Sequence, residues 1–144
     1  MKEIDKHDVA LAASGSIPVV HLRVSSPLEA SYRLILRTSP GAGQRGEVFA
    51  EGALGDDPRK NPDDHAVNFT ANALPRVAEL NGTTLIAVIN FAAAGDPPTA
   101  QVDATAYLTQ DGKYVPNGTA AYTGKFTHIE AVIFRFHLKT ILGK

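Results

Sequence analysis

The sequence contains no cysteine, and this absence removes several classes of site at once. Disulfide bridges, thiolate catalysis and cysteine-ligated zinc or iron–sulfur centres all require that side chain. The fold must therefore be held together by burial of apolar surface. The length of 144 residues is close to that of a common single domain. A chain of this size buries roughly 70% of the surface that it exposes when unfolded, which suffices for a core.

An excess of charge of either sign is also lacking, since 14 lysines and arginines face 15 aspartates and glutamates, for a net charge of -1. Nucleic-acid binders usually carry a strongly basic surface, so we expect no nucleic-acid partner. Apolar runs stop far short of the roughly 18 residues of a membrane helix, so we expect no membrane partner. The longest, residues 85–94, is interrupted by Asn90.

The first eight residues are charged and precede no apolar stretch of the kind that a secretory signal contains. We therefore expect residues 1–8 to form a loosely ordered N-terminal segment. The expected localisation is cytoplasmic, and an exported protein whose signal has been removed stays open as the alternative.

Alternation of apolar and polar residues is the dominant pattern in the chain. In residues 17–25, Val20, Leu22 and Val24 fall on one face, while His21 and Arg23 fall on the other. A period of two is typical of a half-buried β-strand. Further strands are predicted over residues 31–39, 47–54, 66–73, 83–93 and 99–110, of which 83–93 is apolar on both faces.

Turn residues separate these segments. Asp111-Gly112 predicts a two-residue hairpin turn, and Asn117-Gly118 predicts a second tight turn. Residues 74–80 allow about one helical turn. Residues 119–141 predict two strands, or one strand that bends near Gly124. The sequence as a whole predicts an all-β fold, an antiparallel β-sandwich of roughly eight strands in a single domain over residues 1–144. A closed eight-stranded β-barrel is the alternative.

An acidic loop is the first candidate site. Its potential ligands are Asp56, Asp57, Asn61, Asp63 and Asp64. Calcium prefers six to eight oxygen ligands, which a wrapping loop can supply. The spacing does not match an EF-hand, and Arg59 and Lys60 offset part of the charge. The alternative is a solvated loop of local Asx turns. Apart from calcium at this loop we expect no cofactor.

A basic sheet face is the second candidate site, and it would bind a small anionic ligand or a protein partner. The polar faces of three predicted strands contribute His21, Arg23, Arg33, Arg37, Arg135 and His137. Guanidinium groups suit carboxylate, sulfate and phosphate groups. The alternative is that these are ordinary solvent-facing strand positions. Strand order decides between the two.

The sequence gives little indication of catalysis, because none of the five histidines lies in a recognisable nucleophile motif. His21, His128 and His137 lie on predicted strands and would be the residues of a hydrolase-type or zinc site. We therefore predict no catalytic residues.

The function expected from the sequence is a non-catalytic binding or assembly module that forms a homo-oligomer. Residues 83–93 and 131–138 are apolar on both faces, which favours assembly. The C-terminal strand would supply an exposed edge for pairing. The alternative is a barrel that holds a small apolar or anionic ligand, in space left by Ala104, Ala106, Ala121 and Gly124. A histidine-dependent hydrolase is the third hypothesis.

Overall fold

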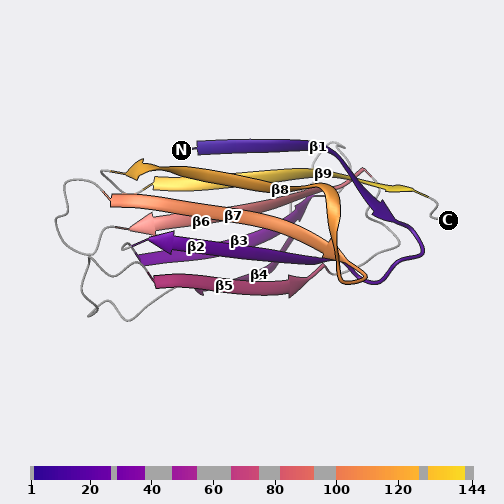
Figure 1. Cartoon of the computed structure of the whole chain (residues 1–144), viewed down its shortest axis with the longest axis horizontal. Helices are drawn as coiled ribbons and strands as arrows, with labels where there is room; N and C mark the ends of the chain where they lie inside the picture. Colours follow the sequence, from indigo (N-terminus) through magenta and orange to yellow (C-terminus); the bar gives the residue numbers. More distant parts are fainter. Residues whose placement is uncertain are drawn as a thin grey trace.

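In the computed structural model, the described residues form nine β-strands (Figure 1). The structure describes residues 2–26, 29–37, 47–54, 66–74, 82–92, 100–126 and 130–141. The strands are β1 (Lys2–Ala12), β2 (Val19–Ser26), β3 (Glu29–Arg37), β4 (Glu47–Leu54), β5 (Ala66–Ala73), β6 (Thr84–Ala92), β7 (Ala100–Gln110), β8 (Lys113–Phe126) and β9 (Glu130–Ile141). Within the described residues, no helix has the length and apolar content that a membrane crossing requires.

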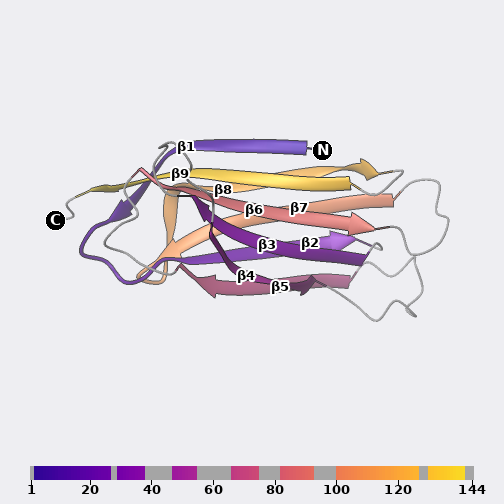
Figure 2. The same cartoon turned by 180° about the vertical axis from the view of Figure 1, so that it is seen from behind.

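The strands form two sheets that lie one upon the other (Figures 1 and 2). The order is β1-β9-β6-β3-β4 in the five-stranded sheet and β5-β2-β7-β8 in the four-stranded sheet. The predicted all-β sandwich is confirmed, with nine strands in place of roughly eight. The closed-barrel alternative is wrong, because the strands divide into two separate ladders and do not form one hydrogen-bonded ring.

The alternation in the sequence is what builds the core between the sheets. On β2, Val20, Leu22 and Val24 are at most 1% exposed. The largest buried side chains are the phenylalanines Phe91, Phe134 and Phe136, all fully buried on β6 and β9. Burying a side chain of this size contributes about 1.5–3 kcal/mol, so these strands supply a large share of the driving force for folding.

The small residues expected to leave space for a ligand do not line a cavity together. Ala104 and Ala106 are buried in the core, whereas Ala121 is exposed. A Cβ atom added at Gly124 would collide with the hydroxyl of Tyr122, so a neighbouring ring already fills that space. The prediction of a ligand space lined by these four residues is therefore wrong, since the sheets pack closely where alanine and glycine allow it.

Strand β1 occupies residues that the sequence predicts as loosely ordered. Residues 2–8 do not form a loose segment, since β1 pairs in parallel with β9, from Lys2 opposite Val132 onward. Val9 and Leu11 are fully buried and anchor the strand. The acidic side chains in the first half of β1 form ion pairs with β9. The charged residues that were expected to be loosely ordered therefore contribute to the attachment of the strand.

Strand β9 is consequently not the exposed edge that the sequence predicts, because β1 pairs with it on one side and β6 on the other. In Figures 1 and 2, β1 runs along the margin of the molecule beside β9. An assembly through a free β9 edge is thereby excluded, since its backbone groups are already paired on both sides.

The hairpin predicted at Asp111-Gly112 is confirmed. Gln110 pairs with Lys113, and both turn residues have positive φ angles, 55° at Asp111 and 74° at Gly112. These angles match the two-residue turn that joins twisted antiparallel strands.

The second predicted turn, at Asn117-Gly118, is wrong, because β8 runs through it without interruption. Asn117 does take a positive φ of 60°, but the ladder with β7 shifts register between Tyr107 and Thr109. The dipeptide therefore serves a bulged strand rather than a chain reversal. The break between β8 and β9 falls after Phe126, not at Gly124. The predicted helical turn at residues 74–80 lies, apart from Leu74, outside the described residues.

Candidate functional site

The predicted basic face is divided between the two outer surfaces of the sandwich. His21 and Arg23 lie on β2 of the four-stranded sheet. The other four lie on β3 and β9 of the five-stranded sheet, namely Arg33, Arg37, Arg135 and His137. All six have outward positions in their ladders, because their strand neighbours are the buried ones. They therefore form two separate groups.

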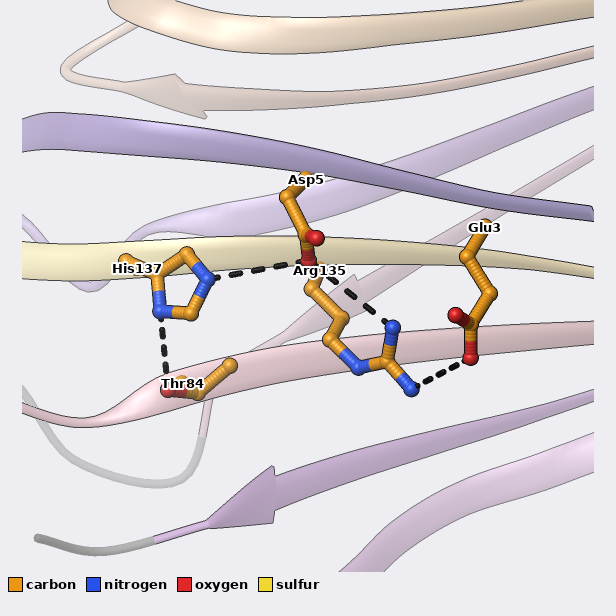
Figure 3. A network of polar contacts seen from close by, with 5 residues as sticks. All are labelled: Glu3, Asp5, Thr84, Arg135 and His137. Atoms are coloured by element: carbon orange, nitrogen blue, oxygen red, sulfur yellow. Dashed lines mark hydrogen bonds and ion pairs between the residues drawn. The ribbon is translucent and has the colours of Figure 1, made fainter.

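On the five-stranded sheet, the charge of Arg135 is already balanced within the chain (Figure 3). Its Nη2 atom donates to Glu3 Oε1 at 2.8 Å, and its Nη1 atom lies 3.8 Å from Asp5 Oδ1. The hydrogen bond to Glu3 raises the pKa of Arg135 above its ordinary value. A guanidinium with two carboxylate partners on β1 has little attraction left for a free anion.

His137 belongs to the same network. Its Nε2 atom lies 3.7 Å from Asp5 Oδ1, and its Nδ1 atom lies 3.4 Å from the Thr84 hydroxyl (Figure 3). The ring of His7 stacks on the ring of His137 at 4.3 Å between centroids. Arg135 and His137 thus hold β1 against β9, a structural role that accounts for both residues.

The two arginines on β3 differ from each other. Arg33 Nε donates to Glu51 Oε2 at 3.2 Å, an exposed pair across β3 and β4. Arg37 is exposed at the end of its strand, and none of the described residues forms an ion pair with it. A single arginine without a described partner does not make an anion site, so the described residues of the five-stranded sheet present no concentrated positive surface.

The outer surface of the four-stranded sheet carries a continuous group of rings. We name this surface the aromatic face and define it by His21, Arg23, Phe69, Tyr107 and Tyr114. The His21 and Tyr107 rings stack at 4.6 Å and 7°, and Tyr107 meets Tyr114 at 5.4 Å between centroids. The guanidinium of Arg23 lies 5.9 Å from the centre of the Phe69 ring. The rings thus extend across all four strands.

His21 is fixed within this face by a hydrogen bond between its Nε2 atom and the Thr109 hydroxyl, at 2.9 Å. Burial lowers the pKa of His21 below its ordinary value of 6.5, because desolvation disfavours the charged ring. His21, which the sequence predicts as an anion-binding residue, is therefore neutral near neutral pH and stacks on its neighbouring ring.

Strand β5 has the reverse of the usual polarity. Phe69 points outward and is 65% exposed, and Ala71 and Ala73 share its face. Thr70 and Asn72 point the opposite way, toward the core, where Thr70 Oγ1 and Asn72 Nδ2 are buried without a hydrogen-bond partner. A strand of a sandwich normally turns its apolar side to the core. This strand instead adds apolar surface to the aromatic face.

The exposure of this surface is large for apolar side chains. Besides Phe69, Tyr114 is 71% exposed and Ile17, just before β2, is 49% exposed. Apolar side chains that gather in water mark interaction sites more often than isolated ones do. The aromatic face is therefore the candidate functional site among the described residues.

Sequence reasoning identified two members of this site, His21 and Arg23, and missed the three rings beside them. Tyr107 follows the polar alternation of its strand, which was the available signal. Phe69 alternates with polar neighbours, and that pattern alone does not say which face of the strand is buried. Only the register of β5 on β2, with Phe69 opposite Arg23, shows the ring to be outside.

Two other predicted sites receive no support from the described residues. The calcium ligands Asp56, Asp57, Asn61, Asp63 and Asp64 all lie outside them. His21 and His137 lie on the outer faces of different sheets, so they do not share a site, and His128 is not described. Among the residues with described positions, no group of three or more histidine, cysteine, aspartate or glutamate side chains is placed to hold a metal ion.

No protein-family model, curated protein or solved structure matches this chain. The geometry of its surfaces is therefore the basis on which a function is proposed.

Proposed function

We propose that this protein is a non-catalytic binding and assembly module that forms a homo-oligomer through the aromatic face. The observation that carries the proposal is the exposure of Phe69 and Tyr114, 65% and 71%, on a sheet surface that also holds stacked rings. Energetically dominant residues of protein interfaces are enriched in tyrosine and arginine and cluster together. The composition of the aromatic face matches that description.

The apolar area is large enough to drive a measurable association. Aromatic side chains bury about 150–250 Å² each when fully covered, so Phe69 and Tyr114 together still expose on the order of 250 Å². At about 25 cal/mol per Å², covering them contributes roughly 6 kcal/mol per chain. Association costs about 4–15 kcal/mol in lost freedom of motion, so two such chains balance that cost with a modest surplus.

The polar members of the face favour protein contact over anion binding. His21 is held neutral by its lowered pKa, and Arg23 lies over the Phe69 ring. Stacking of an arginine on an aromatic ring orders both side chains before a partner arrives, which lowers the entropy lost on docking. A ligand held inside a barrel is not possible in this fold, because the two sheets do not close into a barrel.

The test is the mass of the protein in solution, by light scattering and sedimentation velocity over about 1–100 µM, the range in which a weak interface dissociates. We expect the mass to rise with concentration beyond that of one chain. Phe69→Ser and Tyr114→Ser remove the association. Val48→Ser and Ile141→Ser, which change side chains that are 45% and 49% exposed elsewhere, are the matched controls and leave it intact.

Two results would overturn the proposal. One is a single-chain mass for the wild type at every concentration. The other is an equal loss of association in the control variants, which would assign the contact to another surface.

A further inference from the structure

We infer that the partner of the aromatic face is the same face of a second copy of the chain, placed by a two-fold axis that runs parallel to the strands between β2 and β7. This inference rests on the proposed function and names the partner surface. It excludes a ring or filament, in which one face would bind a different face.

The registers of the four-stranded sheet arrange its outward side chains in rows. The middle row runs Ala71, His21, Tyr107, Thr119, and it is flanked by two rows that each carry a ring at one end. One flanking row runs Phe69, Arg23, Thr105, Ala121, from β5 through β2 and β7 to β8. The other flanking row runs Ala73, Val19, Thr109, Tyr114, in the same strand order. Each flanking row therefore has a large exposed ring at one end and an alanine at the other. The rings are at opposite ends, on β5 in one row and β8 in the other.

A two-fold axis between β2 and β7 lays each row of the second copy over the same row of the first copy, in the opposite strand order. It places β5 of each copy over β8 of the other, which is the aligned mode of packing between two sheets. Phe69 then faces Ala121 of the second copy, and Tyr114 faces Ala73 of the second copy. Interfaces pack as densely as protein cores, which requires large side chains to meet small ones. The two flanking rows satisfy that requirement with themselves, while the middle row sets His21 opposite Tyr107 of the second copy.

The charges on the face are complementary under the same axis. Arg23 contacts the Phe69 ring, and no carboxylate among the described residues pairs with it. Asp103 also lacks a partner within the described part of the chain, although it is only one strand away and two residues out of register. That diagonal spans about 7–8 Å, which an arginine can reach, but within the described structure Arg23 lies over Phe69 and forms no ion pair with Asp103.

In the dimer, Arg23 lies over Thr105 of the second copy, one row from Asp103 of that copy. The side chain of Arg23 is long enough to reach Asp103 of the second copy, and the two-fold symmetry forms this ion pair twice. Charges that are unpaired in one copy thus find their partners in the other, which favours the second copy over an unrelated surface. The five-stranded sheet contrasts with this, since Arg33 and Arg135 are paired within the chain.

The size of the face suits a concentration-dependent dimer. Four strands about 4.8 Å apart and eight residues long, at about 3.3 Å each, cover roughly 500 Å². Two copies bury about 1,000 Å² in total, the lower bound for a specific interface. We therefore expect a dimer that dissociates on dilution.

Charge reversal tests the inference. Arg23→Asp and Asp103→Arg each place like charges opposite one another, and we expect either variant alone to dimerise at least about tenfold more weakly. Mixing the two variants restores association, because every cross-copy pair is then of opposite charge. Affinity tags of different kinds on the two variants, with native mass spectrometry, identify the mixed dimer. Circular dichroism confirms that both variants are folded.

A second test examines the packing of Phe69 by placing a large side chain at the position opposite it. Ala121→Arg fills the position that Phe69 of the second copy occupies, and we expect it to abolish the dimer. Ala53→Arg adds the same side chain at an exposed position on β4 and leaves the dimer intact.

The outcomes separate this inference from the proposed function. A wild type that stays monomeric overturns both. A wild type that associates, with the mixed variants no tighter than either variant alone or with Ala121→Arg still dimeric, overturns the two-fold pairing and leaves assembly through the face standing. Recovery in the mixture together with loss in Ala121→Arg supports the inference.

Discussion

Replacing Gln110 by methionine is expected to destabilise the protein by about 3 kcal/mol, because this side chain fastens the connection between β1 and β2. Gln110 is 9% exposed at the end of β7. Its Oε1 atom accepts from the Ala12 amide at 2.8 Å, and its Nε2 atom donates to the carbonyls of Ala12 and Ser16 at 2.9 and 3.0 Å. No other side chain reaches these three backbone groups among the described residues.

The magnitude follows from those three bonds. A hydrogen bond within a protein contributes about 1 kcal/mol net, and leaving its partner buried and unpaired costs more than replacing both groups. Methionine keeps the length of the side chain and its packing, so the loss is confined to the polar contacts. Three bonds correspond to about 3 kcal/mol, a large fraction of the roughly 5–15 kcal/mol that stabilises a typical domain.

Equilibrium unfolding in urea measures this change as a lower midpoint at an unchanged slope. Gln101→Met is the matched control, because Gln101 lies on the same strand, faces outward and forms no side-chain hydrogen bond among the described residues. We expect the control to stay within about 0.5 kcal/mol of the wild type. A loss below about 1 kcal/mol in Gln110→Met would refute the reasoning, since water would then be replacing the three bonds at no cost.

Two further predictions concern histidine and the charges on β1. The pKa of His21 is lowered by burial, so the unfolded chain binds this proton more readily than the folded one, and stability falls as the pH drops below 6.5. Urea unfolding at acidic and neutral pH checks this, and His21→Phe should flatten that part of the pH dependence; an unchanged slope contradicts it. Arg135→Gln removes the 2.8 Å bond to Glu3, and because the pair is partly exposed we expect a global loss below about 1 kcal/mol. Amide exchange should nevertheless accelerate in β1, and equal exchange in the variant and the wild type would show that backbone pairing alone holds the strand.

Much of the fold was predictable because its strands alternate. The alternation on β2 predicted that Val20, Leu22 and Val24 share one face, and all three are buried in the core. The hairpin at Asp111-Gly112 was predictable for a local reason, since the turn type demands those residues. β1 was not predictable from alternation. It pairs with β9, which lies at the other end of the sequence, and its Glu3 forms a hydrogen bond with Arg135, 132 positions away.

The candidate site was predictable only in part. His21 and Arg23 were identified from their outward parity, which is a local property of β2. The grouping of these residues with Arg135 and His137 failed because it required the strands to be neighbours in one sheet. Phe69 was not identified, because alternation alone does not say which face of an edge strand is buried. Its exposure follows from the pairing of β5 with β2.

The sequence by itself determined the strand content, the parity of most strands and the position of the main hairpin, because these depend on neighbours within a few residues. Only the tertiary structure decided which strands share a sheet, and with that which side chains share a surface. Sheet order depends on contacts between distant segments, such as β1 with β9. The free energy of those contacts cannot be judged from the local sequence pattern. The aromatic face exists for that reason: β5 and β8 contribute rings to one surface because β2 and β7 lie between them.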